Sequence, residues 1–465
     1  MRYYSTNGKA LLATLEKAVV KGLAEDKGLY MPERIKPLPA SLFDEIQDMT
    51  LQEIAYRVAD CFFGEDVDAE SLRKIVNDTL AFDIPLVKVE KVKRLKGEKE
   101  CPIYSLELFH GPTLAFKDVG ARFMARLLQH FVKKEAPSPL PPGGSASKQR
   151  GSGERTLNVL VATSGDTGSA VANGFLGVEG IHVYVLYPKG KVSPIQECQF
   201  TTLGQNITAI EVDGVFDDCQ ALVKNAFMDE ELNARMRLTS ANSINVARFL
   251  PQSFYYFWAY AQLKKETVNR KLSNSKLVCC VPSGNFGNIC SALFGKRMGL
   301  PISRFIAANN ANDVFYKYIQ SGKYEPKASI QTLANAMDVG APSNFARILD
   351  LYGNSYEAIC HDISSATYSD EQIAETMREC LAETGYQLDP HGACGYRALR
   401  EGLKDGEVGF FIETAHPAKF KQTVDDICGT DIEIPARLQA FMKGTKQSVP
   451  MSKDFDDFKS YLLGR

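Results

Sequence analysis

The pattern of hydrophobic positions changes about 100 residues into the chain. Within residues 1 to about 95, apolar residues recur at helical spacing at Leu11, Leu12, Leu15, Ala18 and Val19. That spacing predicts one amphipathic helix. The same criterion predicts further helices near Leu51–Val58 and Ala69–Leu80. Residues 1–95 are therefore expected to form a mostly helical N-terminal domain.

Beyond residue 100, short β-branched runs alternate with helical stretches. The runs are Leu157–Ala162, Ile181–Tyr187, Ile207–Val212, Leu277–Val281, Phe305–Ala308 and Val408–Ile412. This alternation predicts an α/β architecture of mostly parallel sheets with covering helices, and we expect two such domains, at 96–240 and 241–465. Sheets of this kind bind ligands beyond the carboxyl ends of their strands, so the loops after these runs are the first candidates for a site.

Composition narrows the class of protein. The 465 residues are 45% hydrophobic and 24% charged with a net charge of -2, which argues against a disordered chain and against the basic field of a nucleic-acid-binding protein. No apolar run approaches the roughly 20 residues of a membrane span. The eleven cysteines are scattered without a CxxC pair, and the N-terminus lacks a secretory pattern. These features predict a cytoplasmic protein with no membrane or nucleic-acid partner.

One segment interrupts the alternation of strands and helices. Residues Pro137–Gly153 are rich in Pro, Gly and Ser and offer little to bury. We interpret them as an exposed loop inserted between a helix and a strand, with no assigned role.

Lys117 is the first candidate for chemistry. Apolar residues step by three or four from Phe116 onward, so a helix is predicted to begin there with Lys117 in its first turn. The helix dipole and apolar neighbours both disfavour an ammonium at that place, which suits a nucleophilic amine that forms a Schiff base. A surface lysine whose stem covers apolar neighbours is the alternative, and it is the commoner situation for an isolated lysine.

Two glycine-rich loops follow predicted strands and precede predicted helices. They are Thr163–Gly168 (TSGDTG) and Ser283–Asn288 (SGNFGN). Small residues before a helix N-terminus allow backbone N–H groups to converge on a phosphate or carboxylate. Simple tight turns remain the alternative for both loops. Neither loop matches the P-loop or the dinucleotide fingerprint.

Two further segments carry polar groups at predicted loop ends. The first segment places neutral donors and a guanidinium within two helical turns, at Asn242, Ser243, Asn245 and Arg248. A guanidinium suits phosphate. A capped helix with a surface arginine fits the pattern as well. In the second, Thr414 follows a strand and could bond a heterocycle nitrogen or cap a helix.

No metal site is expected in this chain. His391 and Cys394 form an isolated H-x-x-C, with no second pair to complete a ligand set.

Taken together, these blocks resemble the threonine synthase family of pyridoxal-phosphate enzymes, which have the tryptophan-synthase-β type fold (fold type II). The resemblance covers nearly the whole chain. ELFHGPTLAFKD is the most specific block, and it is joined by SGDTG, NSINVAR, GNFGN, ETAHPAKF and the opening YYSTNG.

The resemblance implies roles for individual residues. Lys117 would be the catalytic Schiff-base lysine. The remaining cofactor-binding residues would be Gly284, Asn285, Phe286, Gly287 and Asn288 around the cofactor phosphate, with Thr414 on the pyridine nitrogen. The substrate-binding residues would be Ser164, Asp166 and Thr167 at the α-carboxylate, with Asn242, Ser243 and Arg248 at the phosphate. Asp166 departs from the Asn that many relatives of this fold carry, so its contact with the cofactor stays open.

The resemblance also implies the reaction. Pyridoxal 5'-phosphate would serve as cofactor for the conversion of O-phospho-L-homoserine and water to L-threonine and phosphate, a lyase step of threonine biosynthesis. Competing hypotheses are a serine or threonine dehydratase, a cysteine synthase, a phospho-lyase that makes a keto acid, and a non-catalytic sensor that kept the fold. The oligomeric state, monomer or homodimer, stays open.

Overall fold

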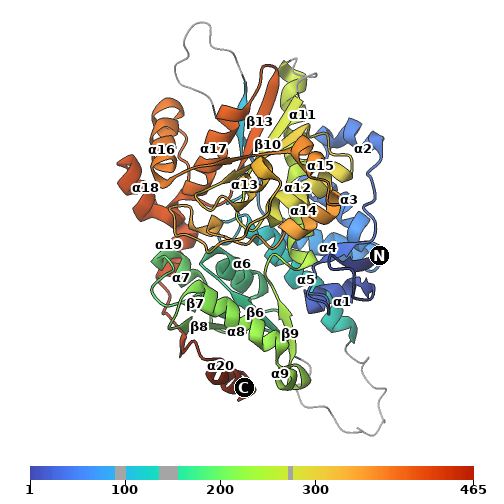
Figure 1. The fold of residues 1–465 in the computed structure, drawn as a ribbon, viewed down its shortest axis with the longest axis vertical. Coiled ribbons are helices and arrows are strands. Elements are labelled where there is room, and N and C mark those ends of the chain that lie inside the picture. Colours follow the sequence, from blue (N-terminus) through green and yellow to red (C-terminus); the bar gives the residue numbers. More distant parts are fainter. Residues whose placement is uncertain (90–100, 136–155, 271–275, 465) are drawn as a thin grey trace.

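The computed structural model describes residues 1–89, 101–135, 156–270 and 276–464. Figure 1 shows two large sheets, with β10 and β13 in the upper half of the view and β6 to β9 in the lower half. The predicted insertion at 137–153 lies outside the described residues. Among the described helices, none combines the length and hydropathy needed to cross a membrane.

The N-terminal region is helical, as predicted, and also contains a small sheet that the sequence did not reveal. Its helices are α1 (Leu15–Lys21), α2 (Ala40–Glu45), α3 (Leu51–Phe63) and α4 (Ala69–Thr79), with a 3-10 turn η1 (Ile46–Asp48). An antiparallel sheet in the order β2 (Ala13–Thr14), β1 (Arg2–Ser5), β3 (Tyr30–Pro32) accompanies them. Strands of two to four residues are too short to show a period of two.

The first predicted helix starts later than its hydrophobic spacing suggested. Thr14 caps it by accepting a hydrogen bond from the Lys17 amide, so the helix begins at Leu15. Leu11 and Leu12 precede it and are 84% and 51% exposed. The apolar stripe was therefore extended wrongly by one turn.

The six-stranded sheet is mostly parallel. Its order is β12 (Ile363–Thr367), β11 (Arg304–Asn309), β10 (Lys276–Pro282), β13 (Glu407–Glu413), β5 (Ile103–Glu107), β4 (Leu86–Lys88). Every pair is parallel except β4 with β5. Because β10, β13 and β5 are parallel neighbours, the loops that follow them leave the sheet at the same edge.

The five-stranded sheet is parallel throughout. Its order is β14 (Val449–Met451), β8 (Ile207–Val212), β7 (Ile181–Pro188), β6 (Leu157–Ala162), β9 (Arg237–Ser240). All six strands predicted from the sequence are confirmed. The domain boundaries at 95 and 240 stay a prediction. The strand order adds that β5 lies in the six-stranded sheet and β14 in the five-stranded sheet.

Helices cover both large sheets. They are α5 (Lys117–Glu135), α6 (Asp166–Phe175), α7 (Pro194–Thr201), α8 (Phe216–Met228), α9 (Glu230–Arg235), α10 (Val246–Phe249), α11 (Phe254–Arg270), α12 (Gly287–Arg297), α13 (Val314–Ser321), α14 (Phe345–Leu351), α15 (Tyr356–Asp362), α16 (Asp370–Thr384), α17 (Pro390–Gly402), α18 (Lys421–Cys428), α19 (Ala436–Met442) and α20 (Phe455–Leu463), with the 3-10 turns η3 (Leu250–Ser253), η4 (Asn335–Met337) and η5 (Pro417–Phe420). One hydrophobic cluster runs from the N-terminal helices into both sheets. Within it the rings of Phe63 and Phe123 lie 4.8 Å apart between centroids.

Candidate active site

Lys117 is the first residue of α5, where the sequence pattern placed it. The loop before it is folded around Asp118, whose carboxylate accepts hydrogen bonds from the Thr113 amide at 2.8 Å and the Thr113 hydroxyl at 2.6 Å. A Cβ at Gly111 would lie too close to the same carboxylate, so glycine at this position leaves room for the Asp118 side chain. Asp118 therefore fixes the loop that presents Lys117 at the helix N-terminus.

The surroundings of Lys117 favour its neutral amine. The side chain is half-buried, and burial lowers its pKa to about 8. The charge of Asp166 opposes this shift, while the nearby positive charges of Lys419 and Arg248 add to it. An amine with this pKa is available as a nucleophile near neutral pH.

Thr414 is held beside the loop that carries Lys117. The Phe116 amide donates to the Thr414 carbonyl oxygen at 2.8 Å, and the His416 amide donates to the Leu114 carbonyl oxygen at 3.1 Å. The cap of the following turn η5 is His416, so Thr414 does not cap it. The buried side chain of Thr414 therefore has no capping role in η5.

The glycine loop after β10 leads into α12, whose N-terminal residue is Gly287. Asn288, in the first turn, accepts hydrogen bonds on its Oδ1 from the hydroxyls of Tyr255 at 2.5 Å and Tyr256 at 2.6 Å. This fixes the amide orientation and leaves Nδ2 buried, without a hydrogen-bond partner in the described part of the chain. A buried donor left unpaired costs about 1–3 kcal/mol, and a phosphate at the helix N-terminus would satisfy it.

Gly284, in the same loop, packs against the turn η4. A Cβ at Gly284 would lie 2.7 Å from the Cα of Met337. That turn is held by His391, whose Nε2 accepts from the Ala336 amide at 3.2 Å while Nδ1 contacts the Asp389 carboxylate at 2.6 Å. His391 therefore supports the glycine loop indirectly, by holding the turn η4 against which Gly284 packs.

Arg248 lies in α10 and is only 2% exposed, so it is not the surface residue that the alternative interpretation proposed. Its Nε and Nη1 atoms are buried and have no partner among the residues described. Burial lowers the pKa of the guanidinium to about 10. A Cβ at Gly120 would collide with the Arg248 carbonyl oxygen, which shows how closely α5 approaches α10. The guanidinium is thus a buried cation near Lys117, with two nitrogen atoms that lack a partner in the described part of the chain, and it is suited to an anion.

The segment before α10 meets the glycine loop. Asn285 Nδ2 donates to the Ser243 hydroxyl at 2.7 Å. Asn242 carries a buried Oδ1 without a partner among the described atoms. Asn245 faces elsewhere: it caps α10 and donates from Nδ2 to the Val19 carbonyl oxygen at 2.8 Å. Ser243 therefore contacts the glycine loop, with Asn242 beside it in the chain, while Asn245 connects this segment to the N-terminal domain.

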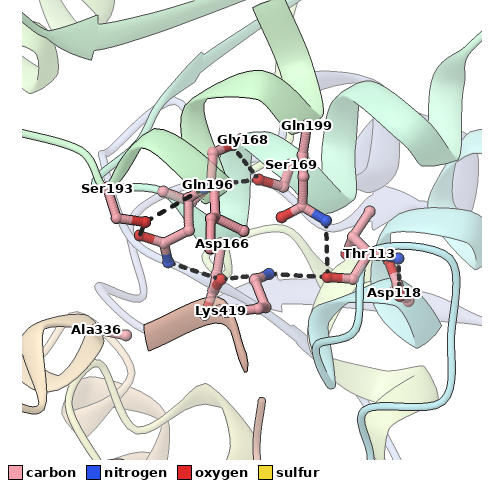
Figure 2. Close-up of polar contacts among 12 residues, drawn as sticks. Thr113, Asp118, Asp166, Gly168, Ser169, Ser193, Gln196, Gln199, Ala336 and Lys419 are labelled. Carbon is pink, nitrogen blue, oxygen red and sulfur yellow. Dashed lines mark hydrogen bonds and ion pairs between the residues drawn. The ribbon is translucent and has the colours of Figure 1, made fainter. Parts of the chain in front are cut away.

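The loop 163–168 is closed by Thr163, whose hydroxyl accepts from the Gly165 amide at 2.9 Å and the Gly168 amide at 2.7 Å. Ser164 and Thr167 are half-buried in this turn. Asp166 Oδ1 lies 2.6 Å from the Lys419 ammonium and accepts from Gln196 Nε2 at 2.9 Å. Figure 2 shows Lys419 between Asp166 and Thr113.

Two buried cations of the site were missed by the sequence analysis. Lys419 belongs to the segment ETAHPAKF, but Asp166 lies far away in the sequence, so the ion pair between them could not be predicted. Arg347 donates to the carbonyl oxygens of Tyr30 and Ile244 and to Asn344 Oδ1, and it gave no local signal. Arg347 thereby joins the N-terminal domain to the segment that carries Ser243.

Comparisons with known proteins agree with this arrangement along the whole chain. Three family models match: pyridoxal-phosphate dependent enzyme at residues 79–413, threonine synthase N terminus at 2–80 and threonine synthase, C-terminal at 392–462. A threonine synthase from Serratia marcescens is 40% identical over 464 residues, which cover 100% of this chain and 99% of that protein. The chain belongs to the threonine synthase family.

Solved structures of the family show the same fold. Threonine synthase from Escherichia coli superposes with a TM-score of 0.86 and 39% identity, covering 100% of both chains. A PLP-bound threonine synthase from Brucella melitensis gives 0.87 and 32%, covering 100% of this chain and 99% of that one. These matches confirm the predicted fold type II architecture. The comparisons also show threonine synthase activity and dependence on pyridoxal phosphate.

Proposed function

We propose that this enzyme converts O-phospho-L-homoserine and water to L-threonine and phosphate, with Lys117 and Arg248 at the two ends of the substrate. The observation that carries this proposal is Arg248, a buried guanidinium with two unpartnered nitrogen atoms among the described residues, close to a half-buried lysine. An amino acid with a distal phosphate would engage both groups. Dehydratase and cysteine synthase substrates in most cases lack that second anion.

The residues present fit pyridoxal phosphate. Lys117 would hold its aldehyde carbon, the loop Gly284–Asn288 its phosphate and Thr414 its pyridine nitrogen. The unpartnered Asn288 Nδ2 supports this placement, since it lies buried at a helix N-terminus and lacks an acceptor among the described atoms. When bound, the cofactor supplies the electron sink that makes protons on the substrate carbons acidic.

Within this proposal the protein's own groups orient the substrate and move protons. The Lys117 amine would accept the proton from Cα, because burial lowers its pKa to about 8 and so leaves part of the population neutral near neutral pH. The same amine is placed to move protons at the carbons beyond. The loop at Ser164, Asp166 and Thr167, in which Asp166 is buried and the other two residues are half-buried, receives the α-carboxylate.

The distal end of the substrate meets the segment before α10. Asn242 and Ser243 orient the phosphate, and Arg248 stabilises it as it leaves. A hydrogen bond to a charged group contributes about 1.5–3 kcal/mol. Thr414, a neutral partner, would leave the pyridine nitrogen largely unprotonated and so moderate the electron sink.

Product analysis tests the proposal. Purified enzyme with cofactor is incubated with O-phospho-L-homoserine, and threonine, phosphate and keto acid are measured together, with ammonia release from threonine as the comparison. Threonine and phosphate in equal amounts are expected. Phosphate with a keto acid would instead make the enzyme a phospho-lyase, and ammonia from threonine alone would make it a dehydratase.

We further propose a cytoplasmic location. No disulfide joins any of the eleven cysteines, all of which lie within the described residues, and a reducing compartment suits such a protein.

A further inference from the structure

The loop assigned to the substrate carboxylate itself contains a carboxylate. Asp166 begins α6 and is 5% exposed. Although burial raises its pKa, the positive charges of Lys419 and Lys117 outweigh this and hold the pKa well below the usual range, so Asp166 is ionised. A second carboxylate brought to this loop would be repelled unless the charge of Asp166 is cancelled.

Lys419 is placed to cancel that charge. Its ammonium lies 2.6 Å from Asp166 Oδ1, and its side chain has an exposed fraction of 0%. The same ammonium donates to the Thr113 carbonyl oxygen at 2.9 Å, so two of its three N–H bonds are committed to the protein. Gln196 donates to the same Asp166 oxygen, which fixes the carboxylate from a second side.

The pair also joins the two sheets. Asp166 follows β6 of the five-stranded sheet, and Lys419 lies in η5, after β13 of the six-stranded sheet. Figure 2 shows Gln196 and Ser193 on one side of Asp166 and Lys419 on the other. The lysine that neutralises the loop therefore comes from the segment that also carries Thr414.

We propose that Lys419 is a specificity-determining residue for an anionic substrate: it neutralises Asp166 and holds that side chain in place, so that loop 164–168 accepts the substrate carboxylate. This inference rests on the substrate assignment made under the proposed function. Lys419 acts through Asp166 and does not touch the substrate, so it is a positioning residue.

The balance of buried charge favours this role over a purely structural one. Lys419 and Asp166 carry opposite charges 2.6 Å apart, so they cancel each other beside Lys117. Removal of Lys419 alone leaves an excess negative charge, which repels an anionic substrate. Removal of the Asp166 charge together with that of Lys419 returns the net charge beside Lys117 to its original value and should restore binding of the substrate.

The test is a rescue experiment on the holoenzyme, with KM and kcat for O-phospho-L-homoserine measured separately. Lys419→Met should raise KM by at least about tenfold, because an uncancelled charge within several Å is worth more than about 1.4 kcal/mol in a protein site. The effect on kcat should be smaller. The double variant Lys419→Met/Asp166→Asn should return KM to within about threefold of wild type, and Lys419→Arg should do the same by keeping the charge.

The controls distinguish a charge effect from loss of folding or of cofactor. Lys443→Met removes an exposed lysine and should leave KM unchanged. Visible absorbance reports cofactor content, and thermal unfolding reports folding. An unchanged KM in Lys419→Met, or a double variant no better than the single one, would overturn the proposal. Threonine formation by the wild-type enzyme is measured separately. An error in the proposed reaction can therefore be distinguished from an error in the proposed role of Lys419.

Discussion

The amide of Phe116 donates a 2.8 Å hydrogen bond to the carbonyl oxygen of Thr414. These residues follow β5 and β13, which are parallel neighbours in the six-stranded sheet. Lys117, next to Phe116, and Thr414 therefore lie at the same edge of the sheet, although they are far apart in the sequence. β10 is the other neighbour of β13, and its glycine loop completes the set.

Replacement of Lys117 by alanine should abolish cofactor attachment. The amine is the only part of the side chain that can bond covalently to an aldehyde, so the visible absorbance of the purified enzyme should disappear together with activity. Lys133→Ala, an exposed lysine in the last turn of the same helix, is the matched control and should keep both. Borohydride reduction followed by peptide mapping should label Lys117; a label on another lysine would contradict the assignment.

Replacement of Arg248 by methionine should weaken substrate binding without loss of the cofactor. Loss of a hydrogen bond to a charged group predicts a KM about 10- to 100-fold higher. The two nitrogen atoms without partners among the described residues cost stability in the free enzyme, so this variant should unfold at the same temperature as wild type or higher. Thermal unfolding with and without inorganic phosphate measures both effects. Stabilisation of the variant by phosphate equal to that of wild type would remove Arg248 from the anion site.

Tyr255 and Tyr256 should control cofactor affinity through Asn288. Their hydroxyls fix the amide so that Nδ2 remains available, and the double variant Tyr255→Phe/Tyr256→Phe frees the amide to rotate. We expect the dissociation constant of the cofactor to rise about tenfold, equivalent to one modest hydrogen bond of about 1.4 kcal/mol. Tyr260→Phe, a half-buried tyrosine of the same helix, is the control. Equal affinities in all three proteins would contradict the role of Asn288.

The pKa of Lys117 predicts how fast cofactor-free enzyme takes up pyridoxal phosphate at different pH values. Burial lowers that pKa to about 8, so the ammonium dominates below this pH and the neutral, reactive amine above it. The rate should fall about tenfold for each pH unit below about 8 and level off above it. Stopped-flow absorbance measures this profile. In Lys419→Arg, which keeps the neighbouring charge, the profile should not move, whereas a rate that rises steadily to about pH 10 would show an unperturbed lysine.

The sequence predicted those parts of the site that are local. Lys117 at a helix start, the glycine loop before α12 and Thr414 after a strand each depend on a strand, turn and helix that are contiguous in the chain. Their periodicities are long enough to recognise, and the resemblance to the family supplied the rest.

Contacts between the two sheets were not predictable in this way. Lys419 meets Asp166 only because η5 and the start of α6 come together in three dimensions. Arg347 was missed for the same reason, since its acceptors include Tyr30 in the N-terminal domain. Leu11 and Leu12 show the opposite error, in which a helical pattern continued past the residue that caps the helix.

Gly120 lets α5 press against the backbone of Arg248 with no side chain between them. The backbone that carries Lys117 is consequently packed directly against the backbone that carries Arg248, and packed main chain cannot stretch as a surface loop can. If Lys117 and Arg248 hold the two ends of the substrate as proposed, a homologue one methylene shorter or longer should bind more weakly, because the backbone contact cannot adjust to its length.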